Sequence, residues 1–405
     1  MTLVSLFNKT FQTHADKVAI EFNDKTVTFG EINKSANKVA NALRDLSVKK
    51  GDRVALFLSN SLELIYFFIG ILKNGSVVVP MNTFFKERET SHILNNSGAK
   101  VILTDKERLP TIKKILPGLE GSKHIITVDS NDLTSYNELI DSASDEDPNI
   151  ELNGQDGSIM FYTSGTTGKP KGVIHDTGGY AIQAYQTCKW NFNLNRGDVM
   201  WCTADVGWIT GHTYAFYGPL LVGATTLIYE GGPDYPNLGR WWKIIKENKV
   251  NVFYTAPTAI RMFMKQGDKW LKKYNLKSLK ILGSVGEPID IDSWNWYFKN
   301  IGKSRCPIMD TWWQTETGGI MISPIPFVTP TIPTFATLPF PGIQPCLMDE
   351  TGEEIKGSAS VFSPNSVLSH ADSSFLNCET PVTSKNNCQF FSLFIGASFM
   401  CESGG

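Results

Sequence analysis

Segments typical of buried strands alternate with helical patterns along the first 130 residues. Such strands are short, rich in β-branched residues and bounded by turn residues. We predict strands at Arg53–Leu58 (RVALFL), Val77–Pro80, Val101–Thr104 and His124–Val128. A second alternating block runs from Ser158 to about Ile322. Because strands separated by helices pair in parallel through crossover connections, the chain is expected to form an α/β fold.

The intervening helices carry recognisable start and stop signals. Thr28 and Glu31 have the spacing of a capping box, and apolar residues follow at helical spacing as far as Leu46. Ser61–Lys73 is predicted to be a largely buried helix that ends before Gly75. Another helix is expected around Arg88–Asn96.

Composition excludes several classes of partner. The 405 residues are 41% hydrophobic, enough for a substantial core, and the net charge of −2 offers no basic surface for nucleic acid or anionic lipid. The first 17 residues have no signal-peptide core, and no apolar run reaches the length of a membrane span. We expect a cytoplasmic protein whose seven scattered cysteines form no metal site and stay reduced.

The chain divides by composition into a large domain and a tail. The large domain covers residues 1–356, with subdomains at about 1–150 and 158–345, and the acidic stretch 131–157 is expected to be a surface connection between them. Residues 357–405 contain hardly any charges, many Ser and no sustained period. This composition suits neither a packed domain nor a well-solvated disordered tail.

A loop rich in Gly, Ser, Thr and Lys follows the predicted strand Ile159–Tyr162. Glycines let the backbone bring N–H groups close to an anion, while the hydroxyls and ammonium groups add donors and charge. The loop is not a Walker A motif, because Pro170 follows its first Lys. The alternatives are a phosphate-binding loop, which the length of the run favours, and a plain surface turn. The proposed phosphate-binding residues are Thr163, Ser164, Gly165, Thr166, Thr167, Gly168, Lys169 and Lys171.

The segment YTSGTTGKPKG resembles the signature of the adenylate-forming superfamily, in which this loop closes over the β- and γ-phosphates of ATP. Three later segments, WCTADVGWITGH, GSVGEP and DTWWQTETGG, resemble the AMP-forming acetyl-CoA synthetases within it. The resemblance implies the large N-terminal domain of that fold, built of layered α/β subdomains. It also implies ATP, CoA and Mg²⁺ as substrates and cofactor.

The same resemblance implies roles for particular positions. Thr163, Lys171 and Glu316 would act in catalysis, and Glu316 would contact Mg²⁺, which prefers carboxylate and phosphate oxygens. Thr210 and Asp234 would contact CoA, although the family carries Asn at the second position. The nucleotide would be held by Gly286, Glu287, Pro288, Asp310, Thr311, Trp312, Trp313, Gln314 and Thr315.

The acid pocket implied by the resemblance would be small. It would be lined by Ile209, Thr210, Val285 and Trp313, and an indole wall leaves room for a short acid such as acetate or propionate. Paired tryptophans are otherwise usually core residues, and His175 and His212 are read first as structural. For His212, next to the pocket, a positioning role is the alternative.

The resemblance implies a two-step ligase reaction: acid and ATP give an acyl-adenylate and pyrophosphate, and CoA then displaces AMP. The family's Thr-Gly-Asp motif, its downstream arginines and its mobile C-terminal domain find no match in 357–405. The tail is therefore read as out-of-frame translation or as a truncated relative. The alternative functions are an impaired ATP- or AMP-binding remnant and an adenylating domain that serves a carrier protein.

Overall fold

The computed structural model describes the chain except for residues 131–132, 164–169, 346, 349–388 and 391–405. The described residues fall into two compact units. The first comprises Met1–Tyr185 and Asp205–Glu230, and the second comprises Gln186–Ala204 and the described part of Gly231–Ile395. The expectation for the tail 357–405 lies, apart from Gln389–Phe390, outside the described residues.

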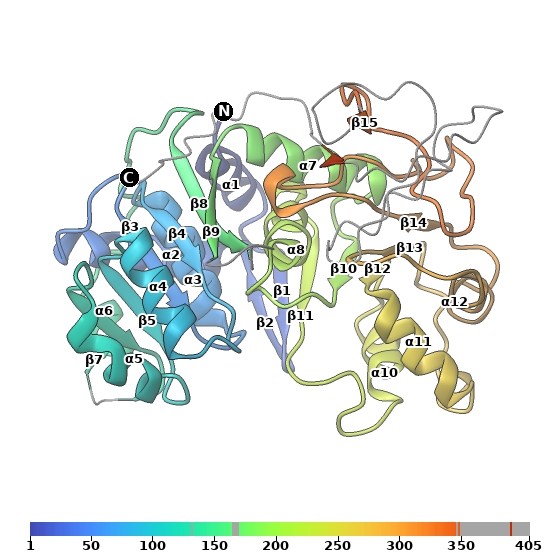
Figure 1. Cartoon of the computed structure of the whole chain (residues 1–405), viewed down its shortest axis with the longest axis horizontal. Helices are drawn as coiled ribbons and strands as arrows, with labels where there is room; N and C mark the ends of the chain where they lie inside the picture. The colour runs from blue at the N-terminus through green and yellow to red at the C-terminus, as the bar shows by residue number, and fades with distance from the viewer. Residues whose placement is uncertain (131–132, 164–169, 346, 349–388, 391–405) are drawn as a thin grey trace. The chain divides into compact units, whose positions relative to one another are not determined.

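The first unit is built around a seven-stranded sheet (Figure 1). All neighbouring strands are parallel except the last pair, which is antiparallel. Two of the four predicted strands have the predicted bounds, and the other two, those that begin at Arg53 and His124, end one residue early. The order across the sheet is β7 (Thr134–Ser135), β6 (His124–Thr127), β5 (Val101–Thr104), β3 (Arg53–Phe57), β4 (Val77–Pro80), β8 (Gly157–Thr163) and β9 (Lys171–Asp176).

Helices connect these strands, as the alternation predicted. The α-helices of this part are α1 (Leu3–Thr13), α2 (Phe29–Asp45), α3 (Leu62–Lys73), α4 (Glu87–Ser97), α5 (Leu109–Ile115) and α6 (Tyr136–Asp141), with the short 3₁₀ turn η1 (Leu116–Gly118) after α5. Helix α7 (Gly179–Asn191) follows β9 and contains the boundary between the two units.

The start of α2 confirms the capping box. Thr28 Oγ1 accepts from the Glu31 amide, and the Glu31 carboxylate accepts from the Thr28 amide. The apolar side of α2 packs against α3, where Gly70 allows close approach: a Cβ there would lie 2.5 Å from the Cβ of Val39. The α2–α3 pair therefore depends on one residue without a side chain.

A smaller group of strands completes the first unit. β1 (Val18–Phe22) pairs in parallel with β11 (Thr225–Ile228) and antiparallel with β2 (Lys25–Thr28). Before β11 the chain forms α8 (Ile209–His212), the π-helical turn η2 (Thr213–Tyr217) and α9 (Gly218–Val222).

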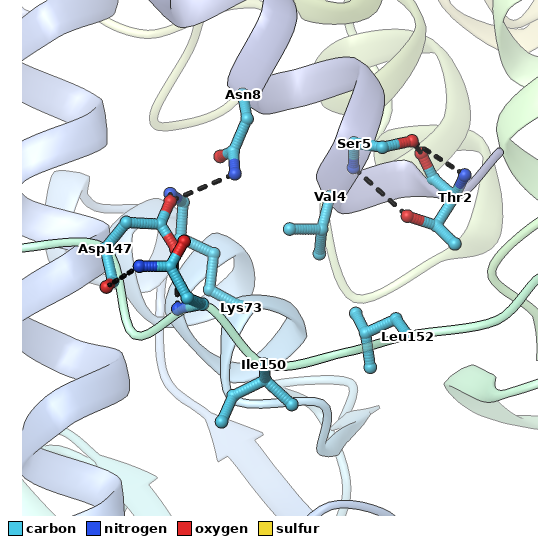
Figure 2. Close-up of a pocket in the computed structure, with 9 residues that line it drawn as sticks. Thr2, Val4, Ser5, Asn8, Lys73, Asp147, Ile150 and Leu152 are labelled. Atoms are coloured by element: carbon cyan, nitrogen blue, oxygen red, sulfur yellow. Dashed lines mark hydrogen bonds and ion pairs between the residues drawn. The ribbon is translucent and has the colours of Figure 1, made fainter.

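The stretch 131–157 is more than the surface connection expected from its polarity. It contains β7 and α6, because Tyr136 and Ile140 bury their side chains. Beyond α6, Asp147 is bonded to the buried Lys73 (Nζ–Oδ2 2.8 Å) and to Asn8 (Nδ2–Oδ2 3.0 Å). These residues line a polar cavity of about 250 Å³ between α1 and the chain leading to β8 (Figure 2).

The second unit contains a parallel sheet with helices between its strands. Its strands are, in order, β14 (Ile308–Asp310), β13 (Ile281–Ser284), β12 (Val252–Thr255) and β10 (Val199–Cys202). The helical segments are α10 (Arg240–Glu247), α11 (Pro257–Gln266), η3 (Leu271–Lys273), α12 (Ile291–Trp296), the π-helical η4 (Tyr297–Ile301) and η5 (Thr315–Thr317). A two-residue antiparallel pair joins β15 (Leu347–Met348) and β16 (Gln389–Phe390).

Aromatic packing closes the core of the second unit. The rings of Trp201 and Trp241 meet at 5.3 Å, and Phe253 lies 5.3 Å from Trp201 in an adjoining contact. All three side chains are buried. The strands β10 and β12 are thereby held to α10 by large apolar contacts. Among the helices described, none is long and apolar enough to span a bilayer.

Candidate active site

The predicted phosphate loop connects two paired strands. Thr163 ends β8 and Lys171 begins β9, and the two residues are partners in the antiparallel register. Thr163 is half-buried, whereas Lys171 is exposed. The rest of the predicted loop, from Ser164 to Lys169, lies outside the described residues. The structure therefore defines the base of this loop and the two predicted residues that flank it.

Helix α4 holds both sides of that base. His92 Nε2 donates to the carbonyl oxygen of Pro170 (3.0 Å), and Tyr162 Oη donates to Asn96 Oδ1 (2.7 Å). His92 and Asn96 are four residues apart and so lie on one face of the helix. Neither residue stands out in the sequence, because each lies more than 60 positions from its partner.

The two predicted nucleotide-binding segments lie together in the second unit. Gly286 lies just beyond the end of β13, and Asp310 is the last residue of β14. These two strands are parallel neighbours, with Ser284 opposite Asp310. Gly286 has φ +96°, a conformation that favours glycine, so the turn depends on this residue. Carboxyl ends of parallel strands are where α/β folds commonly place ligands.

Internal contacts fix the turn at Glu287. Its carboxylate accepts from the Thr258 amide (2.7 Å) and hydroxyl, and pairs with Arg261 Nη2 (2.8 Å). Although burial opposes the effect, the hydrogen bonds from Thr258 and the charge of Arg261 lower the pKa of Glu287. Both partners come from the first half of α11, so this helix shapes the predicted nucleotide-binding turn.

Asp310 is the most buried acid of the predicted site. Asp310 is 6% exposed at the end of β14. Burial raises the pKa of its carboxyl to about 7, and hydrogen bonds from Ser284 and the Thr311 amide oppose this rise. Asp310 therefore changes its charge near neutral pH. Beyond it, Gln314 and Thr315 are half-buried, and Glu316 is exposed in η5.

The two tryptophans of DTWWQTE differ in their contacts. Both are half-buried. The backbone of Trp312 pairs with Ile322 (N–O 2.9 Å), whereas the indole Nε1 of Trp313 donates to Tyr254 Oη (3.3 Å). Val285, the other predicted pocket residue of this unit, is 8% exposed and directly follows β13.

The remaining predicted pocket residues, Ile209 and Thr210, lie in α8 of the first unit. Their neighbour His212 packs edge-on against Phe68 (4.4 Å) and Phe161 (4.8 Å). Complete burial lowers the pKa of His212 to about 3, and the backbone carbonyl of Val206, as a hydrogen-bond acceptor for the ring, opposes this shift. His212 is neutral at physiological pH, and its contacts support the structural interpretation. His175 is likewise buried, stacked on Tyr180.

Gly211 allows the close backbone approach that forms α8. A Cβ at this position would lie 2.2 Å from the carbonyl oxygen of Asp205. Gly211→Ala is therefore expected to destabilise the chain by about 1–3 kcal/mol, the usual cost of overpacking. Urea unfolding of the wild type and the variant measures this change in the free energy of unfolding. Gly118→Ala is the control, because a Cβ there meets no atom within 4 Å, and equal effects of the two changes would contradict the close approach.

The predicted CoA contacts are in different units. Thr210 is half-buried in the first, and Asp234 is exposed in the second, in the segment after β11. Within the described part of the chain, no three His, Cys, Asp or Glu side chains gather as a metal site.

Comparison with known proteins identifies the family. Residues 7–360 match the family described as AMP-binding enzyme. The chain belongs to the AMP-binding enzyme family. It is 43% identical over 367 residues to the acetyl-coenzyme A synthetase of Wolinella succinogenes, and 42% identical over 353 residues to that of Rubrobacter xylanophilus. These matches cover 84% and 82% of the chain but 56% and 55% of the relatives, so the chain spans about half of their length.

A solved structure confirms the fold expected of this family. The crystal structure of the anthranilate CoA ligase AuaEII in complex with anthranoyl-AMP matches with a TM-score of 0.81 and 27% identity, covering 88% of this chain and 68% of that one. The predicted α/β large domain of an adenylate-forming enzyme is thus confirmed. The assignments of individual site residues stay predictions. The structure adds four residues that hold the predicted segments in place: His92, Asn96, Tyr254 and Arg261.

Proposed function

We propose that the chain is an AMP-forming acid–CoA ligase that activates acetate or another short acid, such as propionate, with ATP. One observation carries this proposal: the Gly286 turn, buried Asp310 and Trp313 stand together at the carboxyl ends of β13 and β14. A nucleotide segment and an acid-pocket wall at one sheet edge suit a reaction between a carboxylate and an α-phosphate. The identity to acetyl-coenzyme A synthetases supports acetate.

In the first half-reaction, a carboxylate oxygen forms a bond to the α-phosphorus of ATP. The bond from that phosphorus to the bridging oxygen breaks, and pyrophosphate leaves with the electron pair. The chain's contribution is to position the reactants and to neutralise charge. The Thr163 hydroxyl and the Lys171 ammonium, paired across the base of the β8–β9 loop, would bind the outer phosphates.

The nucleotide would lie along the Gly286–Pro288 turn and the Asp310–Thr315 segment. Arg261 and Thr258 hold Glu287 in place, so the turn is ordered before the nucleotide arrives. Asp310 with its carboxyl at a pKa of about 7 can accept or donate hydrogen bonds at neutral pH.

The acid would bind against Val285 and Trp313 of the second unit, while Ile209 and Thr210 of the first unit stay predicted pocket residues. An indole leaves space for one or two carbons beyond the carboxylate, and a methylene in an apolar pocket is worth only about 1–3 kcal/mol. Discrimination between acetate and propionate is therefore modest. In the second half-reaction the CoA sulfur, after losing its proton, bonds to the acyl carbon, and AMP leaves with the electrons of the broken mixed-anhydride bond.

Thr210 and Asp234 are proposed to contact CoA, and Glu316 to contact Mg²⁺. The exposed carboxylate of Glu316 is a donor of the kind that this ion takes. When bound, Mg²⁺ would neutralise charge on the phosphates. No further residue of this chain is assigned to the metal.

The products test the proposal. The full chain, given ATP, Mg²⁺, acetate and CoA, is expected to form AMP and acetyl-CoA in equal amounts. Acyl transfer to a carrier protein in place of CoA would indicate an adenylating domain with a different acceptor. Binding of AMP without any acid-dependent product would indicate a nucleotide-binding remnant.

Lys171→Ala is expected to raise the KM for ATP at least tenfold, because a phosphate contact at the base of the loop is lost. The change should leave folding intact, since Lys171 is exposed. Initial rates at varied ATP measure the effect. Lys189→Ala is the control, because Lys189 bonds only to the chain segment at Leu194 and Asn195 in the bonds described. An unchanged KM in Lys171→Ala would exclude the phosphate role.

A further inference from the structure

Trp313 is connected to the nucleotide turn by a chain of three hydrogen bonds. The indole Nε1 of Trp313 contacts Tyr254 Oη at 3.3 Å, and Tyr254 Oη contacts Thr311 Oγ1 at 2.7 Å. Thr311 Oγ1 in turn donates to the carbonyl oxygen of Ser284 at 2.7 Å. Ser284 ends β13, directly before Val285 and Gly286.

The chemistry of the two ends fixes the direction of this chain. An indole N–H only donates and a backbone carbonyl only accepts. The hydroxyl of Tyr254 therefore accepts from Trp313 and donates to Thr311, whose own proton goes to Ser284. Each proton is used once. Burial raises the pKa of Tyr254 well above its usual value, so the phenol keeps the proton that this arrangement needs.

Tyr254 is itself held rigidly. It is fully buried in the middle of the second unit, and its ring lies 4.8 Å from that of Phe192. On another side stands Gly283, where a Cβ would come within 2.4 Å of Tyr254 Cδ2. The ring therefore has no room to shift. Trp313, by contrast, is half-buried in the irregular chain between β14 and η5.

We propose that Tyr254 is a positioning residue that sets acid specificity: its hydroxyl holds the indole of Trp313 in one orientation and thereby fixes the length of the acid pocket. This inference rests on the proposed function, in which Trp313 closes the pocket. An indole free to change its orientation leaves a deeper pocket, so longer acids enter.

Tyr254→Phe tests the proposal with little change in volume. The ratio of kcat/KM for acetate to that for butyrate is expected to fall about tenfold, through better use of butyrate. Tyr297→Phe is the matched control. Tyr297 is also fully buried, and its hydroxyl donates to the carbonyl oxygens of Phe253 and Gly283. Removing this hydroxyl perturbs the same core but leaves the hydrogen bond of Trp313 in place. An unchanged ratio in Tyr254→Phe, or an equal fall in both variants, would overturn the proposal.

A readout without substrate separates this inference from the proposed function. The indole N–H resonance of Trp313, assigned with Trp313→Phe, is expected to shift and to exchange faster with solvent in Tyr254→Phe, but not in Tyr297→Phe. A resonance that stays in place means that Tyr254 does not hold Trp313, whatever the enzyme does. A resonance that moves while the acid ratio stays constant refutes the specificity role alone. If the wild type activates no acid, the proposed function fails, and the resonance still decides the contact.

Discussion

Replacing Asp310 with Asn is expected to stabilise the chain by about 4 kcal/mol at pH 8. Burial of this carboxyl raises its pKa from the usual 3.8 to about 7. That difference corresponds to about 4 kcal/mol of penalty for folding with the group ionised. Asn has nearly the same shape and carries no charge, so it avoids this penalty while keeping a polar group beside Ser284 and Thr311.

The sign of the pH dependence follows from the raised pKa. Below about pH 4 the carboxyl is protonated in both the folded and the unfolded chain, so Asp310 does not lower the free energy of unfolding. Between about pH 4 and 7 only the unfolded chain loses the proton, so the stability of the wild type falls as pH rises. Above about pH 7 the full penalty is present. The advantage of Asn should therefore grow from pH 5 to pH 8.

Urea unfolding of wild type and Asp310→Asn at four pH values measures this advantage. Asp52→Asn serves as a control of opposite sign. Although burial opposes it, hydrogen bonds from Lys100 and Lys49 lower the pKa of Asp52, so its replacement should cost stability at pH 8. Parallel stability curves for wild type and Asp310→Asn would show that Asp310 is not buried as described.

Trp313→Gly is expected to change acid preference more than any other single substitution. Removing the indole opens the proposed pocket by several carbon atoms, and each additional methylene that becomes buried is worth about 1–3 kcal/mol. Relative kcat/KM for butyrate over acetate should rise by about 100-fold or more. Initial rates with acetate, propionate, butyrate and valerate measure the shift.

Trp312→Gly is the matched control for this change. Trp312 is the adjacent residue, is also half-buried, and has its backbone paired with Ile322. Its loss should lower activity with every acid alike, because it belongs to the proposed nucleotide segment. A retained preference for acetate in Trp313→Gly, or the same new preference in both variants, would refute the pocket assignment.

Local signals predicted the fold of the first unit well. The capping box at Thr28, the strand from Arg53 and the helix after Ser61 are each decided by residues within one or two turns of chain. The short strand and helix at Thr134–Asp141 were missed, because the surrounding acidic residues hide the apolar contacts of Tyr136 and Ile140. Tertiary burial outweighs local polarity there.

The candidate site was predictable only where its residues form a contiguous motif. The turn at Gly286 and the segment from Asp310 stand in the sequence as recognisable runs. The residues that hold them do not: Tyr254 is 59 positions from Trp313, and His92 is 78 from Pro170. Such contacts depend on which strands become neighbours in the sheet, and nothing in the local pattern specifies that.

Acetate-dependent exchange of labelled pyrophosphate into ATP by the full chain is the most direct test of the proposed ligase. The exchange requires only the first half-reaction, so it reports on nucleotide, phosphate and acid sites together and does not need CoA. We predict exchange that depends on acetate, weakens with butyrate and is lost in Lys171→Ala at low ATP. Tight binding of ATP or AMP with no exchange at any acetate concentration would contradict the ligase and indicate a nucleotide-binding remnant.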